Sequence, residues 1–371
     1  MDAAEHHSPA GEDGLRPVGG SVARSAARHP RVSVVIPCYN YAEYLDAALR
    51  SVLSQQGVDL DVTIVDDGST DGSLEISRDW VVRDSRVALK VHDENRGHID
   101  TFNDALASAK APYVVKLDPD DLLTPGSLRR SADVLERHPD VSFVYGRSLY
   151  FRGAAPQVPG VGTRSVRVWA GERWVWRRAA GGVNVIRQPE VMIRTSMLAL
   201  SGGHRSEVPE ASDYHLWLRL ASTGQVARIR GPVQGLYRLH AASMQHTIHS
   251  GILSDLRART RAFDLFLDEC ADTLRDPEGV RQRAHRTLSR EAILRALDAF
   301  DAGTAATEPI DGLVELALQL DEGVMRTSRW RQLQRHISRG RDSRTPWWSM
   351  ARLLRKLRWN HRVAWMTRYR T

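Results

Sequence analysis

The sequence predicts an α/β protein with a mostly parallel sheet, helices on both faces of that sheet, and a C-terminal helical appendage. Three observations predict this fold class. Short apolar, β-branched runs alternate with segments of helical spacing between residues 32 and 145. Acidic residues gather where these apolar runs end. From residue 252 onward the spacing of apolar residues is helical throughout.

The first half of the chain carries the alternation. Strands are expected at residues 32–36, 62–65, 87–91, 113–117 and 141–145. Helices are expected between them, at residues 42–54, 74–82, 99–109 and 127–137. Ser69, Thr70 and Asp71 are residue types that cap a helix, and they precede the second one. Single helices between strands indicate βαβ units, whose ligands bind outside the carboxyl ends of the strands.

The second half is less regular. Residues 153–182 are rich in Gly, Pro, Arg and Trp and break the alternation. A helix is expected at residues 214–221, with short strands at 225–230 and 234–237. Residues 1–30 lack apolar periodicity and are expected to form a disordered leader. The chain therefore divides into a leader (1–30), an α/β domain (31–245) and a helical region (246–371).

Composition limits the class of protein. The length suits one large domain plus an appendage, and 42% apolar residues suffice for a core. No run approaches the roughly 20 apolar residues of a membrane span, and Met1 does not open a secretory signal. Cys38 and Cys270 lie too far apart for a metal-binding pair. These features predict a cytosolic, reduced protein.

Basic charge is concentrated in the tail. Residues 326–371 hold 14 Arg and Lys against one acid, a net charge of +13, which leaves −6 on the preceding residues of the +7 chain. Residues 346–368 place Trp, Met and Leu side chains on one helical face and basic side chains on the other. A segment lying on an anionic membrane, at the inner face of the cytoplasmic membrane, is the first interpretation. Packing on the α/β domain and contact with nucleic acid are the second and third.

Three aspartates follow the fourth predicted strand, in the segment KLDPDDLL. Asp118, Asp120 and Asp121 are close enough to repel one another and to raise each other's pKa values. A bound Mg²⁺ or Mn²⁺ would relieve that repulsion, since both prefer oxygen ligands and share their shells with substrate phosphates. The alternative is a solvated acidic turn that caps the helix beginning near Pro125.

Several segments, in order, resemble the family 2 glycosyltransferases, which have the Rossmann-like GT-A fold. They are VSVVIPCYNYAEYLDAALRSVLSQ, VTIVDDGSTDGS, ENRG, VVKLDPDDLLTPGSL, VMIRTSMLALSGGH, SDYHLWLRLA and LYRLHAASM, and they span residues 32–244. The resemblance implies an inverting enzyme that moves a sugar from a nucleoside diphosphate to a hydroxyl acceptor, with a divalent metal on the diphosphate. Uridine is the commonest base in the family, and guanosine and thymidine remain open.

The resemblance assigns the donor-binding residues. Pro37, Tyr39 and Asn40 are expected at the base and ribose, where Tyr39 could stack on the base or simply cover the sheet edge. Asp67 matches the position that accepts a hydrogen bond from the uracil imide, although it also suits a turn or helix cap. Arg96 lies in the loop expected beside the base and phosphates, and it could equally be a solvated arginine.

The metal and phosphate residues follow from the same resemblance. Asp118 and Asp120 form the Asp-x-Asp pair, with Asp118 expected at the donor. Either Asp120 or Asp121 is the direct metal ligand. His240 matches a histidine that closes the metal site or contacts the diphosphate. Arg238 could clamp a phosphate oxygen.

Inversion requires a carboxylate on the sugar face opposite the diphosphate. The family has this base at the start of a helix, before a Leu-Trp-Leu-Arg-Leu run, and Asp213 takes that position. Ser212 stands where many relatives have Glu. Glu210 is the reserve candidate for the base. The alternative role for Asp213 is stabilisation of the helix N-terminus through its dipole.

Two other functions are alternatives to sugar transfer. A sugar nucleotidyltransferase would need a Gly-rich, Arg-containing loop after the first strand, where residues 37–41 read PCYNY. A non-catalytic nucleotide-sugar-binding or scaffold protein would not need Asp213. The expected role is synthesis of a cell-envelope polysaccharide, a glycolipid or a glycosylated metabolite, and the acceptor is a sugar, a lipid-linked sugar or a small molecule.

Overall fold

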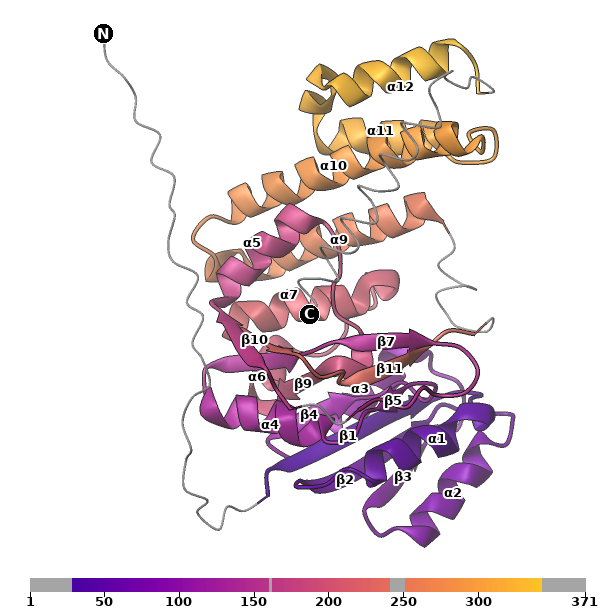
Figure 1. Ribbon diagram of the computed structural model, residues 1–371, viewed down its shortest axis with the longest axis vertical. Helices are drawn as coiled ribbons and strands as arrows, with labels where there is room; N and C mark the ends of the chain where they lie inside the picture. Colours follow the sequence, from indigo (N-terminus) through magenta and orange to yellow (C-terminus); the bar gives the residue numbers. More distant parts are fainter. Residues whose placement is uncertain (1–28, 160–161, 241–250, 342–371) are drawn as a thin grey trace.

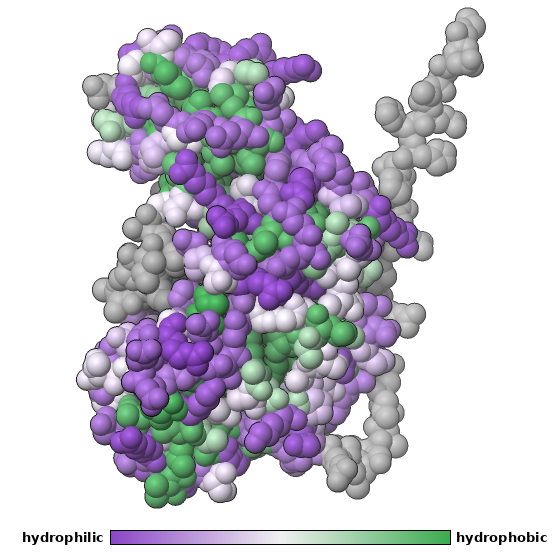
Figure 2. All heavy atoms as spheres, turned by 180° about the vertical axis from the view of Figure 1, so that it is seen from behind, coloured by the Kyte–Doolittle hydropathy of each residue, from purple (hydrophilic) through white to green (hydrophobic). Residues whose placement is uncertain are grey.

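The computed structural model describes residues 29–159, 162–240 and 251–341. They form an α/β body with layers of helices stacked on one side of it, and the chain passes from the body to the C-terminal helices in order (Figure 1). Seen from behind, hydrophobic residues are visible among hydrophilic ones over those C-terminal helices (Figure 2). The predicted α/β body and the helical region from residue 252 are both confirmed.

The main sheet has eight strands in the order β3-β2-β1-β4-β9-β6-β10-β8. Their bounds are β1 (Arg31–Cys38), β2 (Asp59–Asp66), β3 (Val87–Val91), β4 (Tyr113–Lys116), β6 (Val141–Tyr145), β8 (Ser165–Trp169), β9 (Val191–Arg194) and β10 (Gln225–Arg230). The strands β3, β2, β1 and β4 are mutually parallel, as β6 and β10 are. Strand β9 is antiparallel to both neighbours, and β8 is antiparallel to β10. The sheet is therefore mostly parallel, as predicted.

Helices cover both faces because the buried strands present apolar side chains to each side in turn. From β1, Val34 and Ile36 pack with helices α1 (Ala42–Leu53) and α4 (Ser127–Arg137). Val35 points the other way, into the core shared with α3 (His98–Ala107) and α7 (Ser212–Thr223). Helix α2 (Ser73–Arg83) lies beyond α1 and β3. Its start is tied by the carboxylate of Asp71, which accepts from the Ser73 backbone N–H.

A second sheet of three strands was not expected, apart from its strand at residues 234–237. It consists of β5 (Leu122–Leu123), β7 (Ser148–Phe151) and β11 (Gly235–Arg238), in the order β5-β11-β7. Leu122, Phe151, Val233 and Leu236 form its small apolar core. Because β5 begins directly after the aspartate turn, pairing with β5 carries β11 to that turn.

Residues 153–182 are more regular than their composition indicates. They contain β8 and helix α5 (Gly171–Gly181), which packs on α7 and the later helix α10. Trp174 of α5 is buried in the main core, so the tryptophans here are core residues. The remaining short elements are η1 (Gln188–Glu190), α6 (Thr195–Ser201) and η2 (Pro209–Ala211).

The helical region contains α9 (Ile252–Cys270), η3 (Ala271–Thr273), α10 (Pro277–Ala302), α11 (Ile310–Leu320), η4 (Glu322–Arg326) and α12 (Ser328–Ser338). Helix α10 begins at Pro277, behind the capping carboxylate of Asp276, and ends at Gly303, which has φ 74°. Phe263 and Phe266 of α9 belong to the same core cluster as Trp217 of α7. The α/β body and the first appended helix therefore share one core, whichever boundary is drawn near residue 245.

Some predictions fall outside the described residues. They are the leader up to residue 28 and the basic helix at 346–368. Within the described ranges, no helix combines the length and apolar character needed to cross a bilayer. Cys38 and Cys270 are both free thiols.

Candidate active site

The acidic residues predicted at strand ends lie at one edge of the main sheet. Asp66 ends β2, Asp93 and Glu94 follow β3, and Asp118 to Asp121 follow β4. The three strands are parallel members of one sheet, so their carboxyl ends meet at this edge. This edge is therefore the candidate active site.

The aspartate turn is buried, which argues against the solvated-turn interpretation. Asp120 is 9% exposed and Asp121 is 1% exposed. Burial, and then the charge of Asp118, raises the pKa of Asp120. Burial, followed by Asp120 and Asp118, raises the pKa of Asp121 well above its ordinary value. Mutual repulsion was expected from the sequence, and burial is the larger cause.

Strand β11 brings the predicted C-terminal residues to this turn. The Arg238 backbone N–H donates to Oδ1 of Asp121 at 2.9 Å, and its Nε donates to the Asp120 carbonyl at 2.9 Å. Nε2 of His240 lies 2.9 Å from Oδ2 of Asp120. The His240 ring also packs on Tyr44 of α1, with centroids 4.8 Å apart. Residues about 120 positions apart in the chain thus form one cluster.

The cluster fits a divalent cation, although no group of three or more His, Cys, Asp and Glu side chains in the described residues is already arranged around a metal position. Asp120 and Asp121 offer carboxylate oxygens, the ligand type that Mg²⁺ and Mn²⁺ prefer, and His240 adds a ring nitrogen beside them. Oδ2 of Asp121 is buried without a hydrogen-bond partner. A buried carboxylate oxygen is seldom left unpaired, so this atom is the best-placed ligand.

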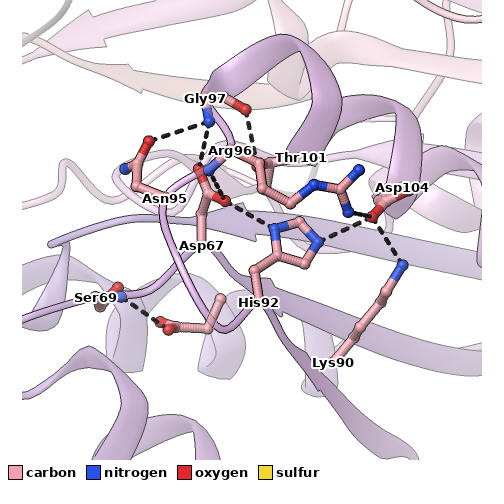
Figure 3. Close-up of polar contacts among 10 residues, drawn as sticks. Asp67, Ser69, Lys90, His92, Asn95, Arg96, Gly97, Thr101 and Asp104 are labelled. Carbon is pink, nitrogen blue, oxygen red and sulfur yellow. Dashed lines mark hydrogen bonds and ion pairs between the residues drawn. The ribbon is translucent and has the colours of Figure 1, made fainter.

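Asp67 lies at the centre of a hydrogen-bonded network (Figure 3). Its Oδ1 accepts from the Arg96 backbone N–H at 2.9 Å and lies 2.7 Å from Nδ1 of His92. Its Oδ2 accepts from the Gly97 N–H at 3.0 Å. Burial alone would raise the pKa of Asp67, but the hydrogen bonds from Arg96 and His92 outweigh it and lower that pKa. Asp67 therefore shapes the loop at residues 92–97, and its predicted contact with uracil stays a prediction.

The same network continues to Asp104 of α3. Nε2 of His92 lies 2.9 Å from Oδ2 of Asp104, which also accepts from Nζ of Lys90 and Nη1 of Arg96, each at 2.8 Å (Figure 3). Arg96, which is predicted to lie beside the base and phosphates of the donor, therefore pairs with Asp104 in this structure. Its side chain is 46% exposed, so it is still accessible to a ligand.

The three residues predicted at the base and ribose differ in their surroundings. Pro37 is buried within β1. Asn40 has φ 61°, and its amide oxygen accepts from the backbone N–H groups of Thr70 and Asp71. Asn40 therefore holds the turn after β2. Tyr39 is 42% exposed, which leaves its ring accessible for the predicted stacking.

Asp213 lies in the first turn of α7, as predicted for the base. Burial raises the pKa of Asp213; Lys116 opposes that shift and Asp118 adds to it. The role of Asp213 as the base therefore stays a prediction. Glu210, the reserve candidate, is an exposed residue of η2. Its carboxylate is therefore less enclosed than that of Asp213.

Several functional candidates were missed from the sequence. Lys116 is buried at the end of β4, where its Nζ lies 2.9 Å from Oδ1 of Asp118 and 3.5 Å from the Phe102 ring centroid. A lysine inside an apolar strand was a visible signal. His92, Asp104, Tyr150 and Arg187 had no such signal, because their partners are distant in the chain.

Comparisons with known proteins agree with this geometry. Residues 33–190 match the model of glycosyl transferase family 2. Chondroitin synthase of Escherichia coli is 27% identical over 203 residues, which are 54% of this chain and 28% of that protein. This chain spans about a third or less of the full length of three curated relatives, that synthase among them.

Two solved structures share the fold. S. aureus TarS 1-349 in complex with UDP-GlcNAc aligns with TM-score 0.59 and 16% identity, over 84% of this chain and 92% of that one. The mannosyltransferase PcManGT of Pyrobaculum calidifontis, in complex with GDP-Man and Mn²⁺, aligns with TM-score 0.55 and 19% identity, over 87% and 86%. The order of the matched motifs, the acidic sheet edge and these alignments agree. Residues 33–190 therefore match glycosyl transferase family 2, and the described residues have the GT-A fold of these neighbours.

Proposed function

We propose that this protein transfers a sugar, with inversion, from a nucleoside diphosphate sugar to a hydroxyl acceptor, with a UDP-sugar as the first candidate donor. The observation that carries the proposal is the aspartate turn. Two buried carboxylates, Asp120 and Asp121, meet Arg238 and His240 at the sheet edge where ligands of such folds bind.

The donor would lie along this edge. Tyr39 presents an accessible ring to the base, and the loop held by Asp67 presents backbone and Arg96 beside it. Asp118 would accept from donor hydroxyls. Arg238 would bind a phosphate oxygen. Solved neighbours of this fold were crystallised with UDP-GlcNAc and with GDP-Man, which supports a nucleotide-sugar donor and leaves the base open.

A divalent cation, Mg²⁺ or Mn²⁺, would be held by Asp120, Asp121 and His240 and would offset the charge of the departing diphosphate. The neighbour crystallised with Mn²⁺ supports such a cation. The protein's own contribution is a buried acidic turn in which Asp121 accepts from the Arg238 backbone N–H and Asp118 pairs with Lys116.

Asp213 would act as the general base. Its carboxylate takes the proton of the acceptor hydroxyl while that oxygen attacks the anomeric carbon and the bond from this carbon to the diphosphate oxygen breaks. Because attack comes from the side opposite the diphosphate, the anomeric configuration inverts. A raised pKa makes a carboxylate a stronger base, which suits this role.

A thermal-shift experiment tests donor binding. UDP-GlcNAc and GDP-mannose are added to the full chain with and without Mn²⁺, and a Mn²⁺-dependent rise in Tm with either donor is expected. Asp120→Asn together with Asp121→Asn should abolish the Mn²⁺-dependent part. Asp79→Asn, on the exposed face of α2, is the control. No Mn²⁺-dependent shift with any nucleotide sugar would contradict the proposal.

A second experiment separates catalysis from binding. Slow hydrolysis of the bound donor should fall about 10² to 10⁴-fold in Asp213→Asn, while the donor-induced rise in Tm is retained. Glu210→Gln should retain hydrolysis if Asp213 is the base. If Glu210→Gln loses donor hydrolysis and Asp213→Asn retains it, Glu210 is the base. If both variants retain the hydrolysis rate of the parent chain, neither residue is the base, which would support a non-catalytic binding protein.

The proposal for the product and its biosynthetic pathway rests on the sequence alone. A cell-envelope polymer, a glycolipid or a glycosylated metabolite is the proposed product. The basic helix at residues 346–368 is proposed to lie on an anionic membrane surface, which would favour a lipid-linked acceptor. Cosedimentation of the full chain with phosphatidylglycerol vesicles, lost at high salt, is the expected result. Equal recovery with phosphatidylcholine vesicles would contradict it.

A further inference from the structure

Tyr150 is an exposed aromatic residue beside the aspartate turn. It lies in β7, where its neighbours Leu149 and Phe151 turn into the small core and its own ring faces the other way. The ring is 45% exposed. It packs edge-on against Tyr237 of β11, with centroids 5.4 Å apart. Tyr237 precedes Arg238, so Tyr150 lies one strand away from the residue that contacts Asp120 and Asp121.

Arg187 is held against this ring. Its Nε donates to the Tyr150 hydroxyl at 2.5 Å, and its Cζ lies 5.6 Å from the Tyr150 ring centroid. Its Nη1 donates to the Ile186 carbonyl at 3.1 Å. Both acceptors are neutral oxygens. The nearby carboxylate of Glu190 accepts from the Arg187 backbone N–H at 3.1 Å. A guanidinium has five N–H groups to offer, so these side-chain contacts leave donors for a ligand.

The segment that carries Arg187 lies against the catalytic edge. Arg187 precedes η1, and η1 contacts β4, β5 and β11. The contact with β11 is close, because a Cβ on Gly235 would lie 2.5 Å from Cβ of Pro189. The positive charge of Arg187 also acts to lower the pKa of Asp213. The segment that carries Arg187 therefore packs on the strands that flank the aspartate turn.

We propose that Tyr150 and Arg187 form an acceptor subsite for a saccharide that carries a carboxylate or a phosphate. The proposal rests on the proposed function, because it treats Asp213 as the base that receives the acceptor. An exposed tyrosine face suits the C–H face of a sugar ring. A guanidinium whose side-chain hydrogen bonds go to neutral oxygens suits an anion, since its fork matches both carboxylate and phosphate oxygens.

Charge balance supports an anionic acceptor over a second donor contact. The aspartate turn and Asp213 are acidic and would repel a negatively charged acceptor unless a cation faced it. Arg238 already lies at the aspartate turn, where the donor diphosphate is expected. Arg187 lies instead on the Tyr150 side of the small sheet. The two arginines are thus placed for two different anions.

Three probes with one sugar ring test the subsite: methyl β-glucoside, methyl β-glucuronide and glucose 6-phosphate. Binding to the full chain, saturated with UDP and Mn²⁺, is measured by saturation-transfer NMR and calorimetry. The two anionic probes should bind at least ~10-fold more tightly than the neutral one, because a charge-assisted pair replaces a neutral contact. The better of the two distinguishes a carboxylate acceptor from a phosphate acceptor.

Variants assign the effect to residues. Arg187→Gln should remove the preference for anionic probes, and Arg187→Lys should keep part of it, because the charge remains but the fork is lost. Tyr150→Ala should weaken all three probes, whereas Tyr150→Phe should keep the stacking face and lower only the anionic preference. Arg137→Gln, at the exposed end of α4, is the matched control. Circular dichroism and Tm verify that each variant is folded.

The results separate this proposal from the proposed function. Equal binding of neutral and anionic probes by the parent chain overturns the subsite. Loss of UDP affinity in Arg187→Gln also overturns it, because Arg187 would then bind the donor. If UDP itself fails to bind the parent chain, the proposed function fails, and the same probe measurements without UDP still decide the subsite.

Discussion

Asp121 is a buried carboxylate with only one of its two oxygens hydrogen-bonded. Oδ1 accepts from the Arg238 N–H, whereas Oδ2 has no partner. Burial raises its pKa well above the ordinary value. Burying an incompletely paired carboxylate destabilises a fold. An active site can retain such a group when it serves a ligand, as proposed here for a cation.

Asp121→Asn should affect cation binding without destabilising the ligand-free fold. The substitution keeps the oxygen that accepts from Arg238 and removes a buried acid, so the ligand-free free energy of unfolding should stay within about 1 kcal/mol or increase. The Mn²⁺-dependent rise in Tm with donor should disappear. Urea denaturation and thermal shift measure the two effects. A loss of several kcal/mol without ligand would show that Asp121 is a structural residue.

The raised pKa of Asp213 predicts that both kcat/KM and stability depend on pH. The base works only when deprotonated, so kcat/KM should fall as pH drops through its pKa, which burial raises above the ordinary value for Asp. The contribution of Asp213 to the free energy of unfolding changes with pH in the opposite direction. A pKa raised in the folded state adds stability below the unfolded pKa, and that stability is lost as pH rises through the folded pKa.

Two measurements check the prediction for Asp213. A pH–rate profile of donor hydrolysis should show an acidic limb in the parent chain, and residual hydrolysis in Asp213→Asn should lack it. At neutral pH, Asp213→Asn should not lower the free energy of unfolding, because the charged form is the one that burial disfavours. An unchanged acidic limb in the variant would assign that limb to another group.

At the scale of elements, the β3–α3 loop depends on a histidine placed between two carboxylates. His92 contacts Asp67 on one side and Asp104 on the other, and its side chain is 3% exposed. The loop at residues 92–97 is thereby tied to both β2 and α3.

Loosening this loop should affect donor binding more than the chemical step. His92→Ala is expected to raise the donor KM about tenfold, through loss of a charge-assisted hydrogen bond, with kcat changed less. The control is Arg83→Gln, which removes an exposed pair with Asp79 on α2. Steady-state kinetics against donor concentration measure the effect. A fall in kcat at constant KM would show that the loop acts on the reaction itself.

Helix α7 is positioned by a buried arginine. Arg219 is 2% exposed and donates to the carbonyls of Ser201 and Gly203, before the segment that leads to Asp213. Burial lowers the pKa of Arg219 to about 10. Glu269 of α9 lies 3.5 Å from its Nε. Arg205 contacts the same glutamate from a more exposed position, with its side chain 39% exposed.

These two arginines form a matched pair. Arg219→Met should lower the free energy of unfolding by about 2 to 4 kcal/mol, because it leaves buried carbonyls unpaired. Arg205→Met should lower it by less than about 1 kcal/mol, as an exposed ion pair contributes little. Urea denaturation of both variants compares them directly. Equal effects would mean that the carbonyl contacts of Arg219 contribute little.

At the scale of the whole molecule, the appended helices support the catalytic part. Phe263 of α9 is fully buried and packs edge-on against Tyr214, with centroids 5.5 Å apart. Tyr214 follows the proposed base. Arg259 of α9 pairs with Glu291 of α10 and also donates to the carbonyl of Gly182, after α5. The layers from α7 through α9 to the start of α10 (Figure 1) therefore share one core and are linked by buried polar contacts, whereas α11 and α12 pack in a separate apolar cluster.

Phe263→Ala tests this connection. The cavity should lower the free energy of unfolding by about 3 to 5 kcal/mol, and donor hydrolysis should fall because α7 loses support. Val82→Ala, at a position 88% exposed, is the control and should have an effect below about 0.5 kcal/mol. Two unfolding transitions, with only the later one shifted by Phe263→Ala, would show that the helical region folds independently.

The alternation of strands and helices, the edge where Asp67, Asp118 and Asp121 gather, and the position of Asp213 at a helix start could all be predicted from the amino-acid sequence. These features are carried by apolar periodicity and by residues that are neighbours in the chain, which local preferences specify. Helix α4 and strand β6 have the bounds that their periodicity predicts.

The pairing of β5, β7 and β11 could not be predicted from the sequence, and neither could the approach of Arg238 and His240 to the aspartate turn that results from it. The contact of Asp67 with His92 and the contact of Arg187 with Tyr150 are likewise seen only in the folded chain. Partners in these contacts are 25 to 120 residues apart. Short strands of two to four residues have almost no periodicity to recognise. Their register is set by which apolar side chains are buried together, a property of the folded chain rather than of any local segment.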